Sequence, residues 1–335
     1  RVIRIRVMSR EYGMIGRLLA EISYSQKINK ALKNLLKKNN ELSFDAIICL
    51  SPSIFYGSAI KWLKKKFKAK AYLVCRDIFP KWAIDSGLLK KGLLYRYFKY
   101  IEKKLYNSVD IVGIESKADM GYFLNTHTQS KFEVLNNWGS PQSKPLKNQK
   151  KILNPDKVNI LYGGNMAEAQ NLFSLIEIID ESILDGRAIL TLIGSGHQLE
   201  SIKKAVKNKR TKSIKILPEV DSKTYLSILG EADIGLVSLN KDLKSNNYPL
   251  KMMGYLQMSK PILASVNDEN EIIELINKNN IGFVSIAGDE SSFNKNLNTL
   301  IENDDLRRQQ GNNSLKLFND RFTVKKAVDQ IISHF

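Results

Sequence analysis

Residues 158–165 read VNILYGGN: an apolar, strand-like run stops at Gly163 and Gly164, and a helical pattern follows. A strand that ends in glycines before a helix leaves backbone N–H groups and the positive end of the helix dipole open to a phosphate. A tight strand-to-helix turn produces the same pattern. The stretch therefore indicates a nucleotide-binding unit that begins in mid-chain, with a purely structural turn as the alternative.

Strand and helix patterns alternate on both sides of this stretch. The predicted strands span 45–50, 70–75, 109–114, 132–135, 158–162, 188–193, 213–217, 233–238 and 261–264. The predicted helices span 15–38, 54–67, 90–106, 116–124, 168–181, 197–208, 222–229 and 249–258. Such alternation requires crossover connections, so we expect an α/β protein with two Rossmann-like, doubly wound parallel sheets.

A segment without periodicity, 141–157, separates the two halves and contains three prolines. We expect an amino-terminal domain over 1–140, this linker, a second domain over 158–321, and a terminal helix over 322–335. That helix either crosses back to the first domain or ends the second. Because ligands bind at the carboxyl ends of parallel strands, the function is expected in a cleft between facing domain edges.

The composition is that of a globular protein. Its 335 residues are 43% hydrophobic, and no apolar run reaches the roughly 18 to 20 residues needed to cross a bilayer. Cys49 and Cys75 lie in strand-like runs, which favours reduced core residues in a cytoplasmic protein. His127, His197 and His334 show no ligand spacing, so no metal site is expected.

The charge is strongly positive, with Lys+Arg 52 against Asp+Glu 34 and a net charge of +18. This balance suits an anionic partner such as nucleic acid, a membrane surface or a phosphorylated substrate. A general drift toward Lys on solvated helix faces is the alternative. The basic residues gather in two first-half segments, KWLKKKFKAK (61–70) and KKGLLYRYFKYIEKKLY (90–106).

The second of these segments has the pattern of a basic amphipathic helix. Its apolar positions recur at helical spacing: Leu93, Leu94, Tyr97, Phe98, Ile101 and Leu105. A helix that faces the core gives the same stripe. The aromatic content and the basic flank favour contact with an anionic membrane surface, where each Lys or Arg contributes about 1 kcal/mol.

Three features of the second half point to a nucleotide. Gly194 and Gly196 form a second glycine turn after the strand at 188–193. The strand at 213–217 ends at Pro218, where a helix cannot begin at once and backbone groups can pair with a base. In NNYPLKMMGY (246–255), Lys251 follows a proline at a predicted helix start. A lysine in the first helical turn opposes the helix dipole, which is locally unfavourable unless an anion lies nearby. A solvated lysine without a ligand is the alternative.

The order of motifs GGN, GSG, LPEV, ADIGLVSL and NNYPLKMMGYLQMSKPILAS resembles the carboxyl-terminal domain of GT-B retaining glycosyltransferases of family 4. In the first half, RDIFPKWAIDSG (76–87) and VLNNW (134–138) resemble bacterial O-antigen and capsule N-acetyl-L-fucosamine transferases. The resemblance covers nearly the whole chain. The chain begins with Arg1 and a strand-like VIRIRV, and we expect the amino-terminal opening of the family, a strand with a glycine loop, to be missing.

The resemblance implies a UDP-sugar donor, with the diphosphate at Gly163 and Gly164 and the uracil near Pro218 and Val220. It implies transfer with retention, without a metal or other cofactor, because helix dipoles and side chains neutralise the leaving diphosphate. The acceptor would be an undecaprenyl-diphosphate-linked saccharide on the inner face of the plasma membrane. Lipopolysaccharide biosynthesis is then the expected process.

This sequence departs from the family at two places. Asn165 and Gln170 stand where relatives carry Arg and Lys, and neutral amides supply no charge. We therefore expect phosphate binding through the backbone of the turn and through Lys251. Gly254 stands where many relatives carry a Glu that holds the ribose, so that contact would move to Asn247 or be weak. A decayed site is the alternative.

The remaining candidates follow from the same resemblance, each beside a structural explanation. Arg76 and Asp77 would touch the donor and an acceptor hydroxyl, or pair with each other to fix the loop. Trp82 and Asp85 would line the acceptor pocket, although Trp82 also suits a core. The last pair, Asp268 and Asn270, would touch the donor sugar, and an N-cap is the default for either.

Other classes of function fit less well. A UDP-sugar epimerase or hydrolase can share the architecture but normally needs positioned acid and base groups, which the sequence does not demand. A nucleic-acid-binding protein should interleave basic and aromatic residues along one groove, so no nucleic acid is expected. A non-catalytic basic binding protein remains an alternative. GGNMAE lacks the full dinucleotide fingerprint, which disfavours a dehydrogenase.

Overall fold

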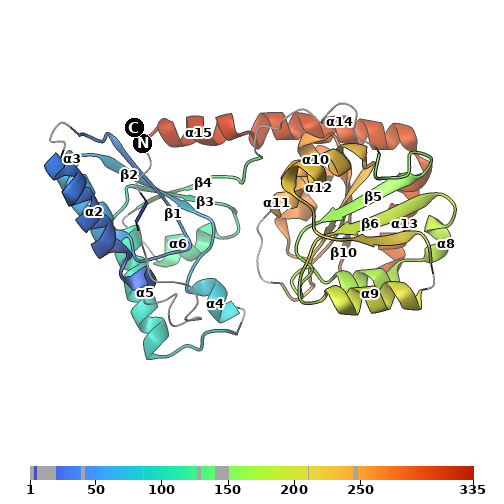
Figure 1. The fold of residues 1–335 in the computed structure, drawn as a ribbon, viewed down its shortest axis with the longest axis horizontal. Coiled ribbons are helices and arrows are strands. Elements are labelled where there is room, and N and C mark those ends of the chain that lie inside the picture. Colours follow the sequence, from blue (N-terminus) through green and yellow to red (C-terminus); the bar gives the residue numbers. More distant parts are fainter. Residues whose placement is uncertain are drawn as a thin grey trace. The chain divides into compact units, whose positions relative to one another are not determined.

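The computed structural model describes residues 4–5, 20–38, 42–85, 87–126, 130–139, 151–209, 211–243 and 248–335. The chain divides into two compact units (Figure 1). Unit 1 comprises Arg1–Asn136 together with Asp329–Phe335, and unit 2 comprises Asn137–Val328. The first boundary thus falls four residues before the 140 that the sequence predicts, and the predicted terminal helix contributes residues to both units.

Unit 1 is built on a parallel sheet with strand order β1-β2-β3-β4. The strands are β1 (Ala46–Leu50), β2 (Lys70–Cys75), β3 (Ile111–Ile114) and β4 (Lys131–Val134). The helices are α2 (Tyr24–Lys38), α3 (Gly57–Phe67), α4 (Lys81–Asp85), α5 (Leu93–Tyr106) and α6 (Met120–Thr126). The central strands β2 and β3 are almost entirely buried, as expected of parallel strands covered on both faces.

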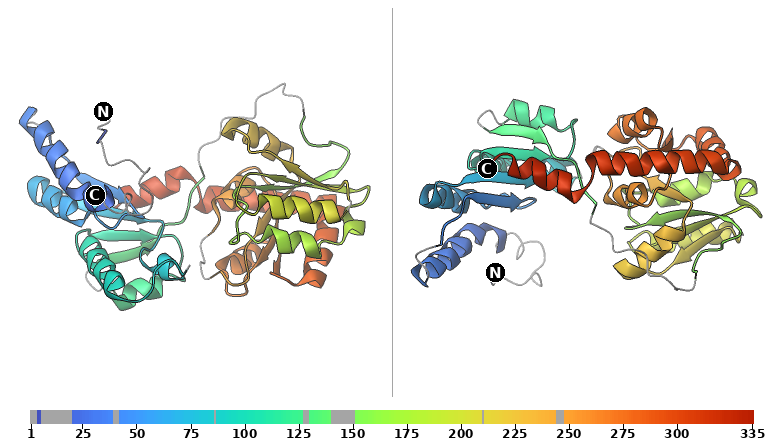
Figure 2. Two further views of the ribbon diagram at one scale, coloured as in Figure 1. Left: turned by 60° about the horizontal axis from the view of Figure 1, so that its bottom comes forward. Right: turned by 90° about the horizontal axis from the view of Figure 1, so that it is seen from above.

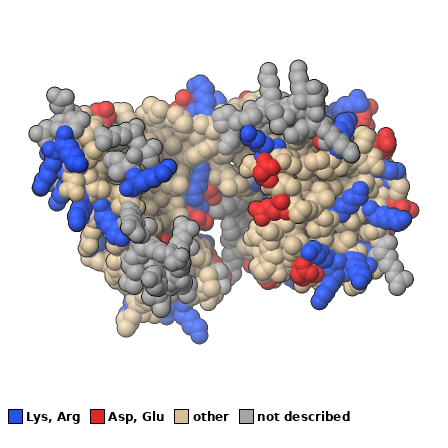
Figure 3. All heavy atoms as spheres, viewed as in Figure 1, with Lys and Arg blue, Asp and Glu red and all other residues tan. Residues whose placement is uncertain are grey.

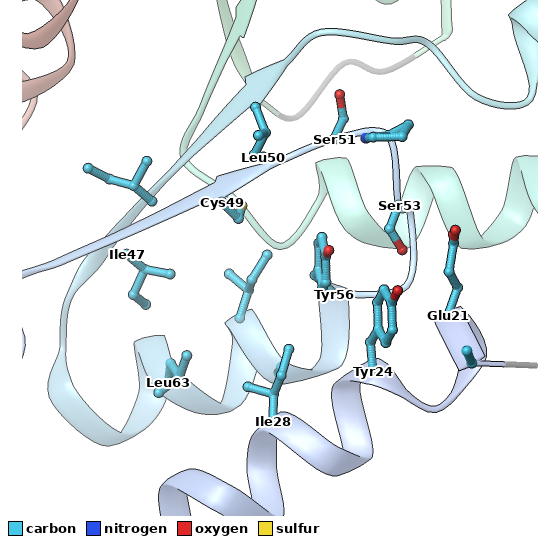
Figure 4. A pocket seen from close by; sticks show the side chains of 15 residues that line it. Glu21, Tyr24, Ile28, Ile47, Cys49, Leu50, Ser51, Ser53, Tyr56 and Leu63 are labelled. Atoms are coloured by element: carbon cyan, nitrogen blue, oxygen red, sulfur yellow. The ribbon is translucent and has the colours of Figure 1, made fainter. Parts of the chain in front are cut away.

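One of the two edge strands of the described sheet, β1, is only half-buried. Ile48 and Leu50 each expose 56% of their surface. A pocket of about 570 Å³ lies between β1 and the helices α2 and α3, with the stacked rings of Tyr24 and Tyr56 on its helical side (Figure 4). Cys49 and the buried Cys75 are free thiols, and burial raises the pKa of each to about 12. Both are therefore thiols, not thiolates, at neutral pH.

Unit 2 is built on a second parallel sheet with strand order β10-β9-β8-β5-β6-β7. The strands are β5 (Val158–Gly163), β6 (Ala188–Ile193), β7 (Ile214–Leu217), β8 (Ile234–Ser238), β9 (Ile262–Val266) and β10 (Gly282–Ile286). The helices are α7 (Leu172–Ile178), α8 (Glu181–Leu184), α9 (Leu199–Asn208), α10 (Ser222–Glu231), α11 (Leu250–Gln257), α12 (Glu271–Asn279), α13 (Glu290–Glu302) and α14 (Asp304–Arg321), followed by α15 (Val324–Ile332). The prediction of two parallel-sheet α/β domains is confirmed (Figure 2), and the strand order of unit 2 is doubly wound.

The side chains of successive β5 residues pack in two separate cores, one on each face of the sheet. Leu161 packs in the core beneath α10, α11 and α14, whereas Ile160 and Tyr162 pack in the core beneath α7, α9 and α13. Side chains alternate across a strand, so a strand with apolar residues at successive positions needs helices on both faces. This is why Ile160, Leu161 and Tyr162 form a continuous apolar run.

The prediction of a single helix over 168–181 is wrong. Residues 167–170 form a turn, and Asn171 has the left-handed φ of 47° immediately before α7 begins. The helix then stops at Ile178, and Asp180 caps a second short helix by accepting a hydrogen bond from the Ser182 N–H. Asn and Asp favour such turns and caps because their side chains compete for backbone N–H groups.

The carboxyl-terminal segment packs on the sheet of unit 1. The Glu133 carboxylate, on β4, accepts hydrogen bonds from Tyr72 (2.6 Å) and Gln330 (2.9 Å), and it lies 2.9 Å from the His334 ring. Gln330 also donates to the carbonyl of Val134. Unit 1 is therefore completed by residues that follow the whole of unit 2 in sequence.

Candidate functional site

The direction of chain progression in unit 2 reverses at β5. The chain runs from β5 outward through β6 and β7, then returns to the other side of β5 as β8, β9 and β10. In open parallel sheets, ligands bind at the carboxyl ends of the strands at such a switch point. The carboxyl end of β5 carries Gly163 and Gly164, so the fold places the predicted glycine turn where a ligand site is expected.

Lys251 lies beside this turn. It is in the first turn of α11, after Pro249 at the N-cap, and its Nζ and Cε lie 3.5 Å from where a Cβ on Gly164 would stand. The ammonium sits over the ring of Tyr162, with Nζ 3.6 Å from the ring centroid. No carboxylate among the described residues forms an ion pair with Lys251.

The environment of Lys251 disfavours its charge. Burial lowers the pKa of Lys251 from 10.5 to about 7, because desolvation penalises the ammonium. A cation that opposes the helix dipole and lacks a described counter-charge is locally destabilising. A bound anion relieves both penalties, so the geometry fits a phosphate ligand better than it fits a structural lysine.

The glycines of the two turns have structural reasons that the sequence did not reveal. A Cβ on Gly163 would stand 2.3 Å from the ring of Tyr225, so this glycine makes room for an aromatic side chain of α10. Gly194, with φ of +149°, would place a Cβ 1.9 Å from the Gly164 carbonyl oxygen, and a Cβ on Gly196 would meet Met166. Packing is therefore a sufficient reason for glycine at all three positions.

The expectation that the turn binds phosphate mainly through its backbone is also wrong for most of its amides. The N–H of Gly164 donates to the carbonyl of Ile193 (2.9 Å), and that of Met166 donates to the carbonyl of Ser195 (2.8 Å). The Gly163 N–H points to the hydroxyl of Tyr255 at 3.4 Å. These groups hold the two turns together, which leaves side-chain charge as the main means of binding an anion here.

Four other predicted donor contacts have different surroundings. Asn165 is exposed beside the turn, and its carbonyl accepts from the Tyr162 hydroxyl (2.6 Å). The Oε1 atom of Gln170 is buried and has no hydrogen-bond partner among the described residues. A Cβ on Gly254 would stand 3.1 Å from the Leu229 side chain of α10, which explains a small residue there by helix packing. Asn247 lies outside the described residues.

The segment after β7 is joined to the second glycine turn. Pro218 is exposed, and Val220 packs against the core beneath α10 and α11. The Ser195 hydroxyl donates to the Glu219 carboxylate (2.8 Å). The structure thus brings the predicted base-binding segment and the turn at 194–196 to the same edge of the sheet.

Asn270 acts as an N-cap, the default that its position predicts. Its Oδ1 accepts from the N–H of Ile272 (3.0 Å), and its Nδ2 donates to Asn267 (2.9 Å). Both ends of the buried amide make hydrogen bonds within the protein, and a contact of Asn270 with the donor sugar stays a prediction. Asp268 is exposed two residues after β9.

In unit 1, three side chains meet at the carboxyl ends of adjacent strands. The Ser51 hydroxyl, after β1, accepts from the N–H groups of Arg76 (2.7 Å) and Asp77 (3.1 Å). Arg76, after β2, forms a 2.9 Å ion pair with Glu115, after β3. The predicted alternative, an Arg76–Asp77 pair, is replaced by this cross-strand pair. Asp77 is exposed, and no ion pair joins it to another described residue.

Trp82 and Asp85 lie on the short helix α4. Trp82 exposes 43% of its surface and contacts the ring of Phe79, so it is not a core residue. Asp85 forms an ion pair with Lys81 one turn earlier (2.8 Å). An exposed indole beside a carboxylate is compatible with a sugar acceptor, which remains a prediction.

Across the described ranges, no cluster of three His, Cys, Asp or Glu side chains is arranged to hold a metal ion. Within those ranges, too, no helix is both long and apolar enough to cross a membrane. Sequence reasoning missed Ser51, Glu115 and Tyr162. The first two follow strands directly, a position that could have marked them, whereas Tyr162 reads as one more apolar strand residue.

Two parallel-sheet α/β units with a site at the switch point of the second define the GT-B class of fold. A family model described as "Glycosyl transferases group 1" matches residues 143–317, and the chain belongs to this family.

Individual relatives are distant. "Probable glycosyltransferase WbjE" of Pseudomonas aeruginosa is 22% identical over 263 residues, which cover 76% of this chain and 63% of WbjE. The chain thus spans less than two thirds of that relative.

Two solved structures share the fold. A point mutant of TarM from S. aureus, crystallised with Fondaparinux, alpha-GlcNAc-glycerol and UDP, has a TM-score of 0.62 at 16% identity; 90% of this chain and 58% of TarM are covered. An E. coli trehalose-6-phosphate structure bound with UDP-2-fluoro glucose has a TM-score of 0.68 at 14% identity, with 95% and 77% covered.

Proposed function

We propose that this protein is a retaining glycosyltransferase of family 4 that transfers a sugar from a UDP-sugar to a lipid-linked saccharide. The observation that carries the proposal is Lys251, a partly buried ammonium beside Gly164 that lacks a described counter-charge. The leaving UDP develops negative charge as the glycosidic bond breaks, and a preorganised cation stabilises that charge. The family match and the UDP in two structural neighbours support a UDP donor.

The donor sugar that we propose is N-acetyl-L-fucosamine, and the acceptor is an undecaprenyl-diphosphate-linked saccharide in O-antigen or capsule synthesis. The segment RDIFPKWAIDSG, which resembles the transferases of that sugar, supports the proposal. Asp77 is the group that we assign to an acceptor hydroxyl, since its carboxylate is exposed at the carboxyl edge of its sheet. Arg76 is then a positioning residue, already paired with Glu115.

A nucleotide panel tests the donor. Thermal shifts are measured with UDP, dTDP, GDP and NAD at equal concentrations, because a ligand that binds only the folded state raises its stability. We expect UDP to give the largest shift. Stabilisation by NAD alone, or by none of the four, contradicts the proposal.

The same lysine offers a sharper comparison. Lys251→Gln should weaken UDP binding by about 1 to 3 kcal/mol, since it removes a charge-assisted contact. Lys204→Gln, on the exposed face of α9, is the matched control and should leave UDP affinity unchanged. Equal UDP affinity of Lys251→Gln and Lys204→Gln would show that Lys251 does not bind the diphosphate.

We also propose that α5 lies on the anionic inner face of the plasma membrane. From Phe98 onward, this helix packs into unit 1 through the buried residues Phe98, Leu105 and Tyr106. The apolar residues before Phe98 are exposed, with Leu93 at 83%, Leu94 at 51% and Tyr97 at 43%. The predicted apolar stripe thus divides into a buried part and an uncovered part.

Basic residues flank the uncovered part. Lys90, Lys91 and Arg96 are all exposed beside Leu93, and Lys104 lies 4.4 Å from the centroid of the exposed Tyr100 ring. A second basic group, in the last turns of α2 and α3, is seen at the left of Figure 3. Apolar side chains within a basic rim match the interfacial region of an anionic bilayer.

Vesicle sedimentation tests this second proposal. Binding to phosphatidylglycerol vesicles should exceed binding to phosphatidylcholine vesicles and should fall as salt screens the lysines. Leu93→Gln together with Tyr97→Gln should reduce binding, whereas Lys204→Gln with Lys207→Gln on α9 removes charge elsewhere and serves as control. If the α9 variant loses as much binding as the α5 variant, the attraction is nonspecific.

A further inference from the structure

The contact between Lys251 and Tyr162 crosses the edge of the sheet of unit 2, because the Tyr162 ring packs on one face and α11 covers the other. Tyr162 belongs to β5 and packs in the core beneath α7, α9 and α13, whereas α11 covers the other face. Lys251 reaches over the carboxyl end of β5 to place Nζ 3.6 Å from the ring centroid. Such a contact is a cation–π interaction at short range.

The Tyr162 ring is held in place independently of the lysine. Tyr162 is fully buried, and its hydroxyl donates to the carbonyl of Asn165 at 2.6 Å, which closes the turn that contains Gly164. The ring is therefore a fixed platform, and the lysine side chain is the flexible partner. A rigid aromatic face at this point decides where the ammonium stands.

The described titratable groups around Lys251 are phenols. Tyr162 faces it from β5, Tyr225 reaches the turn from α10, and Tyr255 stands one turn later on α11 with its hydroxyl toward Gly163. Burial raises the pKa of all three phenols, so they are neutral at physiological pH. In this part of the described chain, the aromatic face thus stabilises the ammonium without neutralising it.

We propose that Tyr162 is a positioning residue of the diphosphate site: its ring holds the ammonium of Lys251 beside Gly164 without neutralising it, so that the bound diphosphate supplies the counter-charge. This inference rests on the proposed function. It assigns a role to an aromatic residue that does not itself contact the donor.

The proposal has a proton-linked signature. Because the pKa of Lys251 lies near 7 in the free protein, the lysine is mostly neutral at pH 8. A bound diphosphate raises this pKa, so the lysine takes up a proton and becomes charged. UDP binding at pH 8 should then take up close to one proton from the buffer. Lys251→Arg stays charged and should bind UDP without that uptake, which also corrects for protons on UDP itself.

Isothermal titration with UDP at pH 8, in HEPES and in Tris, measures uptake from the difference in apparent enthalpy. Tyr162→Phe keeps the ring and should bind within about twofold of the unmodified protein, whereas Tyr162→Leu should lose about 3- to 10-fold in affinity. In a Lys251→Gln background, Tyr162→Leu should cost nothing further, a result that a merely structural role for the ring does not give.

The outcomes separate the two proposals. Absence of UDP binding by the unmodified protein overturns the proposed function and this inference with it. UDP binding without proton uptake, or an equal loss for Tyr162→Leu with and without Lys251, overturns the inference alone. Circular dichroism melting of each variant confirms that the compared proteins are folded.

Discussion

Gly194 and the carbonyl of Gly164 approach so closely that a Cβ on Gly194 would stand 1.9 Å from the Gly164 oxygen. The two glycine turns of unit 2 are thus one packed structure, cross-linked by hydrogen bonds from Gly164 to Ile193 and from Met166 to Ser195. The rigidity of this pair holds Gly164 at a fixed place beside Lys251.

Gly194→Ala should be strongly destabilising. The substitution combines a backbone clash with a φ of +149°, which L residues rarely adopt, and we expect a loss of about 2 to 4 kcal/mol. Gly230→Ala, in α10 with open space around the Cβ, is the control and should be neutral or slightly stabilising. Scanning calorimetry of both variants checks the prediction, and similar melting temperatures would contradict it.

Glu102→Gln should destabilise unit 1. Glu102 is fully buried on α5, and its carboxylate accepts from Lys99 and from the Tyr122 hydroxyl. Breaking a buried ion pair from one side costs about 3 to 5 kcal/mol, because the remaining charge is left uncompensated.

The exposed pair of Glu274 and Lys278 on α12 provides the comparison. Glu274→Gln should change stability by less than about 0.5 kcal/mol, as is usual for surface ion pairs. Calorimetric melting of Glu102→Gln and of Glu274→Gln measures the loss of stability in each variant. Equal effects would mean that the α5 network contributes no more than a surface contact.

Lys251→Met should stabilise the ligand-free protein at low pH. The folded-state pKa of about 7 lies below the unfolded value of 10.5, so the folded protein binds fewer protons between these limits. The stability of the unmodified protein therefore falls as pH decreases from about 10 toward 7, and the penalty is complete below that. Urea denaturation at pH 6.5, 8 and 9.5 should show an advantage of Lys251→Met that shrinks as pH rises. A constant difference would contradict the pKa assignment.

Glu133→Ala should loosen the carboxyl-terminal segment. The substitution removes the acceptor shared by Tyr72, Gln330 and His334, and it leaves the buried Tyr72 hydroxyl without this partner. We expect a loss of about 1 to 3 kcal/mol and faster hydrogen exchange over 329–335. Glu200→Ala, in an exposed pair on α9, should change neither quantity. Unchanged exchange in the Glu133 variant would show that packing alone holds the segment.

The alternation of strands and helices was enough to predict both sheets except for the edge strand β10, because every βα repeat carries its own local pattern. Lys251 was also recognisable as unusual, since a lysine in the first turn after a helix-initiating proline is locally unfavourable. The reasons for Gly163 and Arg76 were not recognisable. Their partners, Tyr225 and Glu115, are distant in sequence and meet them only in the folded sheet. The late start of α7 depended on the left-handed Asn171, and the division from α8 depended on the cap at Asp180; composition alone reveals neither.

The return of Asp329–Phe335 to the sheet of unit 1 has a consequence for synthesis. A nascent chain that has produced β1 to β4 still lacks Gln330 and His334, two of the partners of Glu133, and the ribosome must first make all of unit 2. The amino-terminal unit is therefore completed after the unit that follows it, in reverse of the usual order of domains.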